Sequence, residues 1–246
     1  MADSYRALCT DFYVNQKLQV KLELPKTRET VLDLFERARR QFPTMVNFRR
    51  FRDELALESS QQDMPHRWLA VRGCTLRSGV VNAPGAAESY ALHKTVLELA
   101  PTFLSISSLD IDSIELLYGF DLLASGNHDA IVLDALLHGS PLANLLEIPE
   151  ASPTDFQPII GMRLGRTGEY EVSFEVKTRG ESERNPEGDE PISVYLSVRR
   201  VGPFKDVREL PAVFENLTKI GEKLVEQRLV PNMLVPIREA IGSGNV

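Results

Sequence analysis

Alternation of apolar and polar side chains in three separate segments is the feature that most constrains what this chain can fold into. In residues 17–24 the apolar positions are leucine and valine, and the residues between them are lysine, glutamine and glutamate. The same period of two recurs in residues 170–177 and 192–198. Because successive side chains of a strand point to opposite faces, each segment puts one face in a core and the other in water. Strands of this kind are typical of an antiparallel sheet that is covered on one side.

The first half of the chain places helical spacing between such strands. Apolar residues recur every three or four positions in residues 28–41, where Thr27 can act as the N-cap, and again in a segment that ends near Pro101. Residues 51–58 and 68–80 resemble the two strands of a hairpin, and residues 104–120 a further strand. The order strand, helix, strand, strand, helix, strand predicts a ferredoxin-like βαββαβ half in residues 1–124.

The second half predicts a different arrangement in residues 125–246. A helix is expected over 128–137, followed by a three-stranded antiparallel sheet and a long amphipathic helix over about 207–227 that covers this sheet. Pro231 and Pro236 should bracket a last short helical piece. The predicted fold class is therefore α+β, with the second half packed on the first.

Several functional classes are disfavoured by what the sequence lacks. No apolar run approaches the roughly 18 residues that span a bilayer, and residues 1–6 do not resemble a secretion signal, so we expect a cytoplasmic protein that does not cross a membrane. We find no phosphate-binding loop, dinucleotide-binding turn or nucleophile elbow. We therefore expect no cofactor and favour a protein that is not an enzyme.

Residues 26–52 are strongly basic in a chain whose net charge is -7, with eight basic residues against three acidic ones. Arginine predominates there, and its planar guanidinium suits carboxylates and phosphates. Three interpretations stay open: a solvated edge that resists aggregation, a surface for an acidic partner such as the acidic region of a second copy in a homodimer, or a nucleic-acid site. The candidate interaction surface consists of Arg37, Arg39, Arg40, Arg49, Arg50, Phe51 and Arg52.

A second candidate site is acidic and consists of Asp110, Asp112, Glu115, Asp121 and His128. Carboxylates held together could bind Mg²⁺ or act as acid and base, which would make the chain a small-ligand protein or a magnesium-dependent enzyme. The alternative is that these carboxylates are solvated and that Asn127, just before His128, is a helix N-cap. Trp68, the only tryptophan, is expected to anchor a strand beneath a helix.

The order of elements resembles that of a sporadically distributed bacterial family of about 250 residues. Residues 214–218, Phe-Glu-Asn-Leu-Thr, are similar to the C-terminal region of that family. Because the family has no established activity, the resemblance implies no catalytic residues. The sequence therefore favours a non-enzymatic binding or interaction protein that associates with itself or with another protein.

Overall fold

The nine strands found in the described residues all belong to one antiparallel sheet, in the order β2-β3-β4-β5-β1-β6-β9-β8-β7. The structure is a computed structural model that describes residues 7–146, 148–165, 168–178 and 190–243. The strands are β1 (Asp11–Val20), β2 (Asn47–Phe51), β3 (Glu54–Glu58), β4 (His66–Arg72), β5 (Thr75–Val81), β6 (Ile111–Ala124), β7 (Ile159–Leu164), β8 (Tyr170–Lys177) and β9 (Glu190–Val201).

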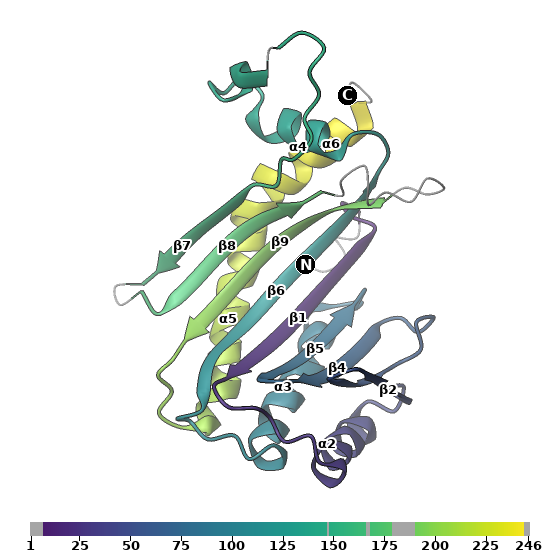
Figure 1. The fold of residues 1–246 in the computed structure, drawn as a ribbon, viewed down its shortest axis with the longest axis vertical. Coiled ribbons are helices and arrows are strands. Elements are labelled where there is room, and N and C mark those ends of the chain that lie inside the picture. The colour runs from purple at the N-terminus through teal and green to yellow at the C-terminus, as the bar shows by residue number, and fades with distance from the viewer. Residues whose placement is uncertain (1–6, 147, 166–167, 179–189, 244–246) are drawn as a thin grey trace.

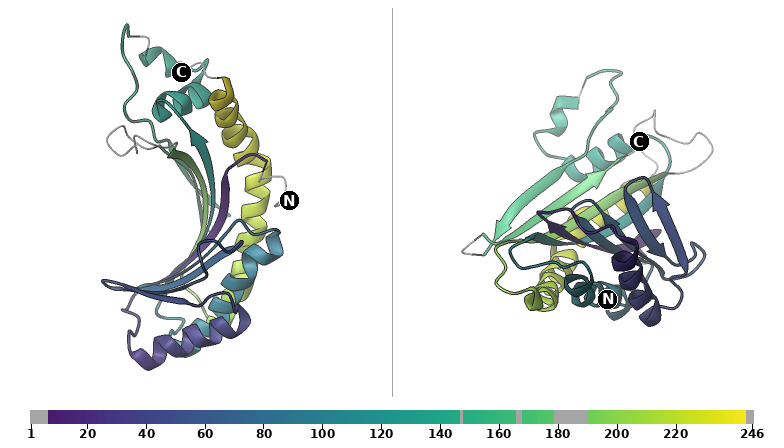
Figure 2. Two further views of the ribbon diagram at one scale, coloured as in Figure 1. Left: turned by 90° about the vertical axis from the view of Figure 1, so that its right-hand side faces the viewer. Right: turned by 60° about the horizontal axis from the view of Figure 1, so that its bottom comes forward.

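Helices cover only one side of this sheet. They are α2 (Arg28–Gln41), α3 (Ala86–Phe103), α4 (His128–Leu137), α5 (Leu210–Leu224) and α6 (Val235–Ser243), with the short helices η1 (Ala143–Leu146) and η2 (Val207–Glu209) and the π-helical η3 (Val225–Leu234). Figure 1 shows the long strands β1, β6 and β9 crossing in front of α5, and α4 and α6 together at one end. In Figure 2 the sheet is curved, with α2, α3 and α5 against its convex side, and no helix covers the concave side within the described residues.

The alternation predicted for the long strands produces this asymmetry. Every second residue of β1, from Phe12 to Val20, is buried against the helices, and the residues between them are partly exposed. The buried side chains of β6, β8 and β9 continue the same layer, and α5 closes it with Leu210, Phe214 and Leu217. The core therefore lies between the sheet and its helices.

Two helices were predicted at their observed bounds. The helices over residues 28–41 and 128–137 are α2 and α4. The predicted N-cap of α4 is also confirmed, since Asn127 Oδ1 accepts hydrogen bonds from the backbone N–H groups of Asp129 and Ala130 at 3.0 and 3.2 Å. Two of the N–H groups that begin a helix without a partner are satisfied in this way.

The two prolines near the C-terminus do not divide the final helix. The chain runs from α5 through η3 into α6 without leaving helical geometry, although Pro231 lies inside η3. The prediction of a separate short piece was therefore wrong. Proline removes a backbone donor, and the wider π-type turn accommodates its ring where a regular α-helix would be interrupted.

The coarse prediction of helices packed on an antiparallel sheet is confirmed, whereas the detailed arrangement is not. Residues 68–80 are not one strand, because the chain turns at Gly73, whose φ is +52°, and forms β4 and β5. The hairpin of β2 and β3 then extends the sheet beyond β4. Neither the ferredoxin-like half nor the separate three-stranded sheet is confirmed, because β9 pairs with β6 and joins all the strands.

The predicted division after residue 124 stays a prediction. The sheet itself crosses this point, since β6 lies before it and β7, β8 and β9 after it. Among the described residues, no helix has both the length and the apolar composition needed to span a membrane.

Candidate functional site

The concave face of the sheet is left uncovered by the described helices, and it is polar with an aromatic centre. Antiparallel register places on it the partly exposed residues of β1, together with their partners on β5 and β6. Besides Phe51 at the end of β2, three aromatic rings stand on this face, from Tyr13 of β1, Trp68 of β4 and Tyr195 of β9. Each is only partly buried. We call these three residues the aromatic group.

Trp68 packs against Gly79 of the neighbouring strand. A Cβ atom at Gly79 would lie 2.2 Å from both Cε2 and Nε1 of the Trp68 ring and 2.5 Å from Asn15 Oδ1. Such distances are possible only because glycine has no side chain. The sequence-based prediction that Trp68 anchors a strand beneath a helix was therefore wrong, since Trp68 and Gly79 are paired on the face without helices.

Tyr13 is held in the same way on Gly119. A Cβ atom at Gly119 would lie 2.1 Å from Cε2 of Tyr13. The Tyr13 hydroxyl lies 3.2 Å from that of Tyr195 and donates to Asp121 Oδ1 at 3.3 Å. Burial raises the pKa of Tyr13 well above its usual range, as do its contacts with Tyr195 and Asp121, so the phenol stays protonated. The two tyrosines are thereby ordered on the surface without being covered.

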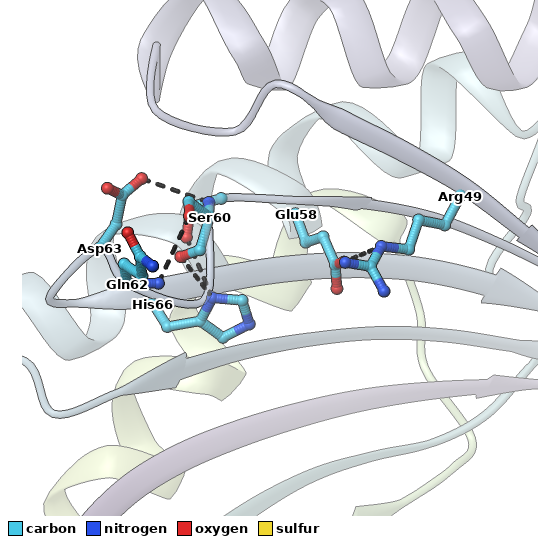
Figure 3. Close-up of polar contacts among 7 residues, drawn as sticks. Arg49, Glu58, Ser60, Gln62, Asp63 and His66 are labelled. Carbon is cyan, nitrogen blue, oxygen red and sulfur yellow. Dashed lines mark hydrogen bonds and ion pairs between the residues drawn. The ribbon is translucent and has the colours of Figure 1, made fainter.

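Ion pairs border the aromatic group on the side of β2 and β3. Arg77 pairs with Glu54, and Arg49 pairs with Glu58 across β2 and β3. Figure 3 shows the Arg49 and Glu58 pair, and beside it the turn between β3 and β4, where His66 Nδ1 lies 3.2 Å from the backbone oxygen of Ser60. Polar borders around an apolar centre are the usual composition of a protein interface.

A shallow open groove of about 540 Å³ lies on the same face toward β7. Its charged lining alternates in sign, from Glu115 through Arg199 and Glu171 to Arg163. Arg199 lies 3.8 Å from Glu171, and Arg163 lies 3.4 Å from the same carboxylate. The concave face therefore offers mixed charge around its aromatic centre, without a strong excess of either sign.

The predicted basic surface is divided by the structure. Arg49 and Phe51 point to the concave face, whereas Arg50 points to the side of α2 and Arg52 lies in the turn after β2. The remaining members, Arg37, Arg39 and Arg40, are exposed on α2, where Arg39 and Arg40 pair with Glu36. The seven residues do not form one surface, because neighbouring positions of a strand face opposite ways.

The predicted carboxylates are spread from Asp110, just before β6, along that strand to Asp121. Asp110 Oδ1 accepts from the backbone N–H of Leu22 at 2.9 Å, Asp112 pairs with Arg199 at 3.2 Å, and Asp121 accepts from Ser193. Asp112 and Asp121 are nine residues apart on one strand, a separation of about 30 Å. Glu115 lies between them on the concave face and lines the open groove. Within the described residues, no three acidic, histidine or cysteine side chains are grouped to hold a metal ion.

His128 is not part of that surface. It is buried at the start of α4, and its Nε2 atom lies 3.0 Å from the backbone oxygen of Ala124. The neighbouring Asp129 is also buried, and its Oδ1 atom accepts from Phe156 N–H at 2.9 Å and from the Thr178 hydroxyl at 2.6 Å. These contacts hold α4 to the loop before β7 and to the end of β8, so Asp129 stabilises the fold.

Sequence reasoning missed Tyr13, Tyr195, Gly79 and Gly119 as site residues. The signal that could have found them is glycine inside a strand pattern, which often marks a close approach of another group. Tyrosine at the polar positions of an alternating strand is the second signal, since an aromatic ring there faces water or a partner.

Comparisons with known proteins add little to this geometry. No protein family model matches the chain, and no curated protein matches it. Among solved structures, the chain is similar to one titled as the immunity protein TplEi of T6SS from Pseudomonas aeruginosa complexed with "L" peptide. The two are 11% identical over 85% of this chain and 90% of that chain, with a TM-score of 0.17, which is too low to support an argument about fold or function.

Proposed function

We propose that this protein is a non-enzymatic binding protein that receives a partner protein on the concave face of its sheet. The observation that carries the proposal is the aromatic group, which is ordered on a face that no described helix covers. Tryptophan and tyrosine are among the residues that contribute most to binding energy at protein interfaces. Rings already held in place by glycine lose little conformational entropy when a partner binds.

The size of the face supports a protein as the partner. Nine strands of about eight residues on average, about 4.8 Å apart and rising about 3.3 Å per residue, span on the order of 1,200 Å². A stable interface buries about 800 Å² on each side. Mixed charge around the aromatic centre favours a partner with its own alternating charges, since like charges that meet would oppose binding.

The magnesium-dependent alternative is less well supported by the described geometry. Asp110, Asp112 and Asp121 already accept hydrogen bonds or pair with arginine, and they lie along a strand instead of around one point. Catalysis needs reactive groups that converge within hydrogen-bonding reach of a substrate. We therefore favour binding over catalysis.

Site-specific photo-crosslinking tests the proposal. A crosslinking amino acid at Lys17 or Ser173 reports on the concave face, and the same group at the exposed positions Glu98 of α3 and Lys223 of α5 is the matched control. We expect a discrete protein adduct from the first pair alone. The captured protein, once purified, should bind the intact chain and alter the emission of Trp68.

Two results would count against this function. One is equal adduct formation at the concave and control positions. The other is an adduct whose purified partner binds a Trp68→Ala variant as tightly as it binds the intact chain, provided that this variant keeps its circular dichroism spectrum. A Trp68→Phe variant keeps an aromatic ring and should bind with intermediate affinity.

Self-association remains part of the proposal, and β7 is the edge that we expect to carry it. Ile159, Ile160 and Met162 of this strand are 64%, 56% and 41% exposed, and one side of β7 has no partner strand in the described chain. An exposed apolar edge is a template for pairing with another strand. Sedimentation equilibrium should show a dimer that Ile160→Lys converts to a monomer, and a monomer at all concentrations of the unaltered chain would contradict the homodimer.

A further inference from the structure

We propose that a separate groove between α2 and the hairpin of β2 and β3 binds a small molecule that carries linked phosphate groups. The groove has a volume of about 270 Å³ and lies on the helix side of the hairpin, opposite the concave face. Four of its lining residues are cationic: Lys26 lies just before α2 and Arg28 begins it, whereas Arg50 lies near the end of β2 and Arg52 in the turn that follows.

None of these four cations is used in an ion pair among the described residues. Three other arginines of α2, β2 and β4 are paired: Arg39 contacts Glu36, Arg49 contacts Glu58, and Arg72 contacts Asp53 at 3.1 Å. Asp53 is the one acidic residue in the lining of this groove. The hydrogen bond from Arg72 is the main cause that lowers the pKa of Asp53, and the charge of Lys26 lowers it further, so this carboxylate stays charged with Arg72 as its ion-pair partner.

The start of α2 adds to the positive potential of the groove. Thr27 is the N-cap residue, but its hydroxyl makes no capping hydrogen bond and lies 2.5 Å from the Thr30 hydroxyl instead. The backbone N–H groups of the first turn point toward the entry of the helix, where anions are favoured. The start of α2 and the end of β2 thus both contribute residues with N–H donors to the lining of one groove.

The backbone of Arg52 is also unusual. Its φ angle is +43°, a left-handed conformation that glycine or asparagine adopts more readily. A two-residue turn of Arg52 and Asp53 joins β2 to β3. An arginine at this position supplies a fourth cation to the groove, although the left-handed backbone conformation is less favourable for arginine than for glycine.

The form of the groove favours a compact ligand over a nucleic-acid strand. A strand of nucleic acid follows an extended basic track with stacked aromatic rings, whereas Arg49 and Phe51 point away to the concave face. Four cations that line one groove match a ligand with several adjacent negative charges, and arginine binds phosphate oxygens in pairs. The apolar floor includes Phe48, whose ring packs on Phe35 and is 51% exposed, so it can contact an organic group attached to the phosphates.

Isothermal titration with inorganic pyrophosphate, ATP and a single-stranded RNA 20-mer tests this inference on the full chain at 50 and 300 mM KCl. We expect pyrophosphate and ATP to bind at low salt and more weakly at high salt. Arg50→Gln with Arg52→Gln should weaken both by at least tenfold. The control variant Arg37→Gln with Arg40→Gln removes the same charge from the exposed side of α2 and should bind like the unaltered chain.

The outcomes separate this site from the concave face. Trp68→Phe should leave pyrophosphate binding unchanged even where it weakens the partner protein, so either proposal can fail alone. The inference is overturned if pyrophosphate and ATP do not bind, or if both variant pairs weaken binding equally. It is also overturned if RNA binds while pyrophosphate does not, which would assign the basic residues to nucleic acid. Thermal unfolding of each variant confirms that the chain is folded.

Discussion

Replacing Gly79 with alanine should displace the Trp68 ring from the concave face. The added Cβ would lie 2.2 Å from two ring atoms, whereas carbon atoms in favourable contact are about 3.5–4.0 Å apart. The ring must therefore retreat by about 1.3–1.8 Å or tilt away from β5. Overpacking of this kind destabilises a protein by about 1–3 kcal/mol, against a gain of about 0.4–1 kcal/mol from the less flexible unfolded chain.

Gly161→Ala is the matched control for this experiment. Gly161 lies on β7, and a Cβ atom there would meet nothing within 4 Å. This variant should keep only the gain of about 0.4–1 kcal/mol in the free energy of unfolding. Gly79→Ala should therefore be less stable than Gly161→Ala by about 1–3 kcal/mol in urea unfolding.

Fluorescence gives an independent readout, because Trp68 is the only tryptophan in the chain. A displaced ring is more exposed to water, so Gly79→Ala should show red-shifted emission and stronger quenching by acrylamide, while Gly161→Ala should not. Partner binding should weaken in the same variant, since the ring would have to be ordered again. Equal stability and equal emission in the two variants would refute the packing of Trp68 on Gly79.

The remaining predictions concern the core beneath the sheet. Burial lowers the pKa of His93 from 6.5 to about 3. The neutral ring therefore contributes stability that is present above pH 6.5 and is lost as the pH falls toward 3. The loss in the free energy of unfolding should be on the order of 5 kcal/mol. A His93→Gln variant should lose this slope in urea titrations between pH 7 and 4, and an unchanged slope would contradict it. Gly221→Ala would place a Cβ 2.3 Å from Tyr118. We therefore expect the free energy of unfolding to fall by about 1–3 kcal/mol, despite the higher helix propensity of alanine. A rise in melting temperature would show that α5 does not approach β6 this closely. Asp129→Ala leaves the Thr178 hydroxyl and the Phe156 N–H without their acceptor. The variant should be less stable by about 1–3 kcal/mol and should show faster hydrogen exchange at the Phe156 amide. Unchanged exchange would argue against the contact between Asp129 and Phe156.

The candidate site could be predicted only in part, because its residues come from strands that are distant in sequence. If residues 47–52 are taken as a strand, neighbouring side chains must point to opposite faces of the sheet. The sequence alone could therefore have placed Arg49 and Phe51 on one face and Arg50 on the other. The pairing of Trp68 with Gly79, or of Tyr13 with Gly119, was not available. It depends on which strands are neighbours and on their register.

Local periodicity determined which segments of this chain become helices and strands. The bounds of α2 and α4 follow from apolar spacing and from polar or proline residues at their ends, since these signals act within one or two turns. The one-sided burial of β1 and β8 follows from alternation for the same reason. These features depend on neighbours in sequence, so the sequence by itself was sufficient.

Tertiary structure decided how those elements combine. The pairing of β6 with β9 joins the two predicted sheets into one. The aromatic group is left uncovered because the long helices pack on the convex side of that sheet. An alternating strand has a polar and an apolar face whichever way the sheet is assembled, so its own pattern does not say what stands opposite the polar face. That is decided by contacts between residues far apart in the chain, which form only when the whole sheet is in place.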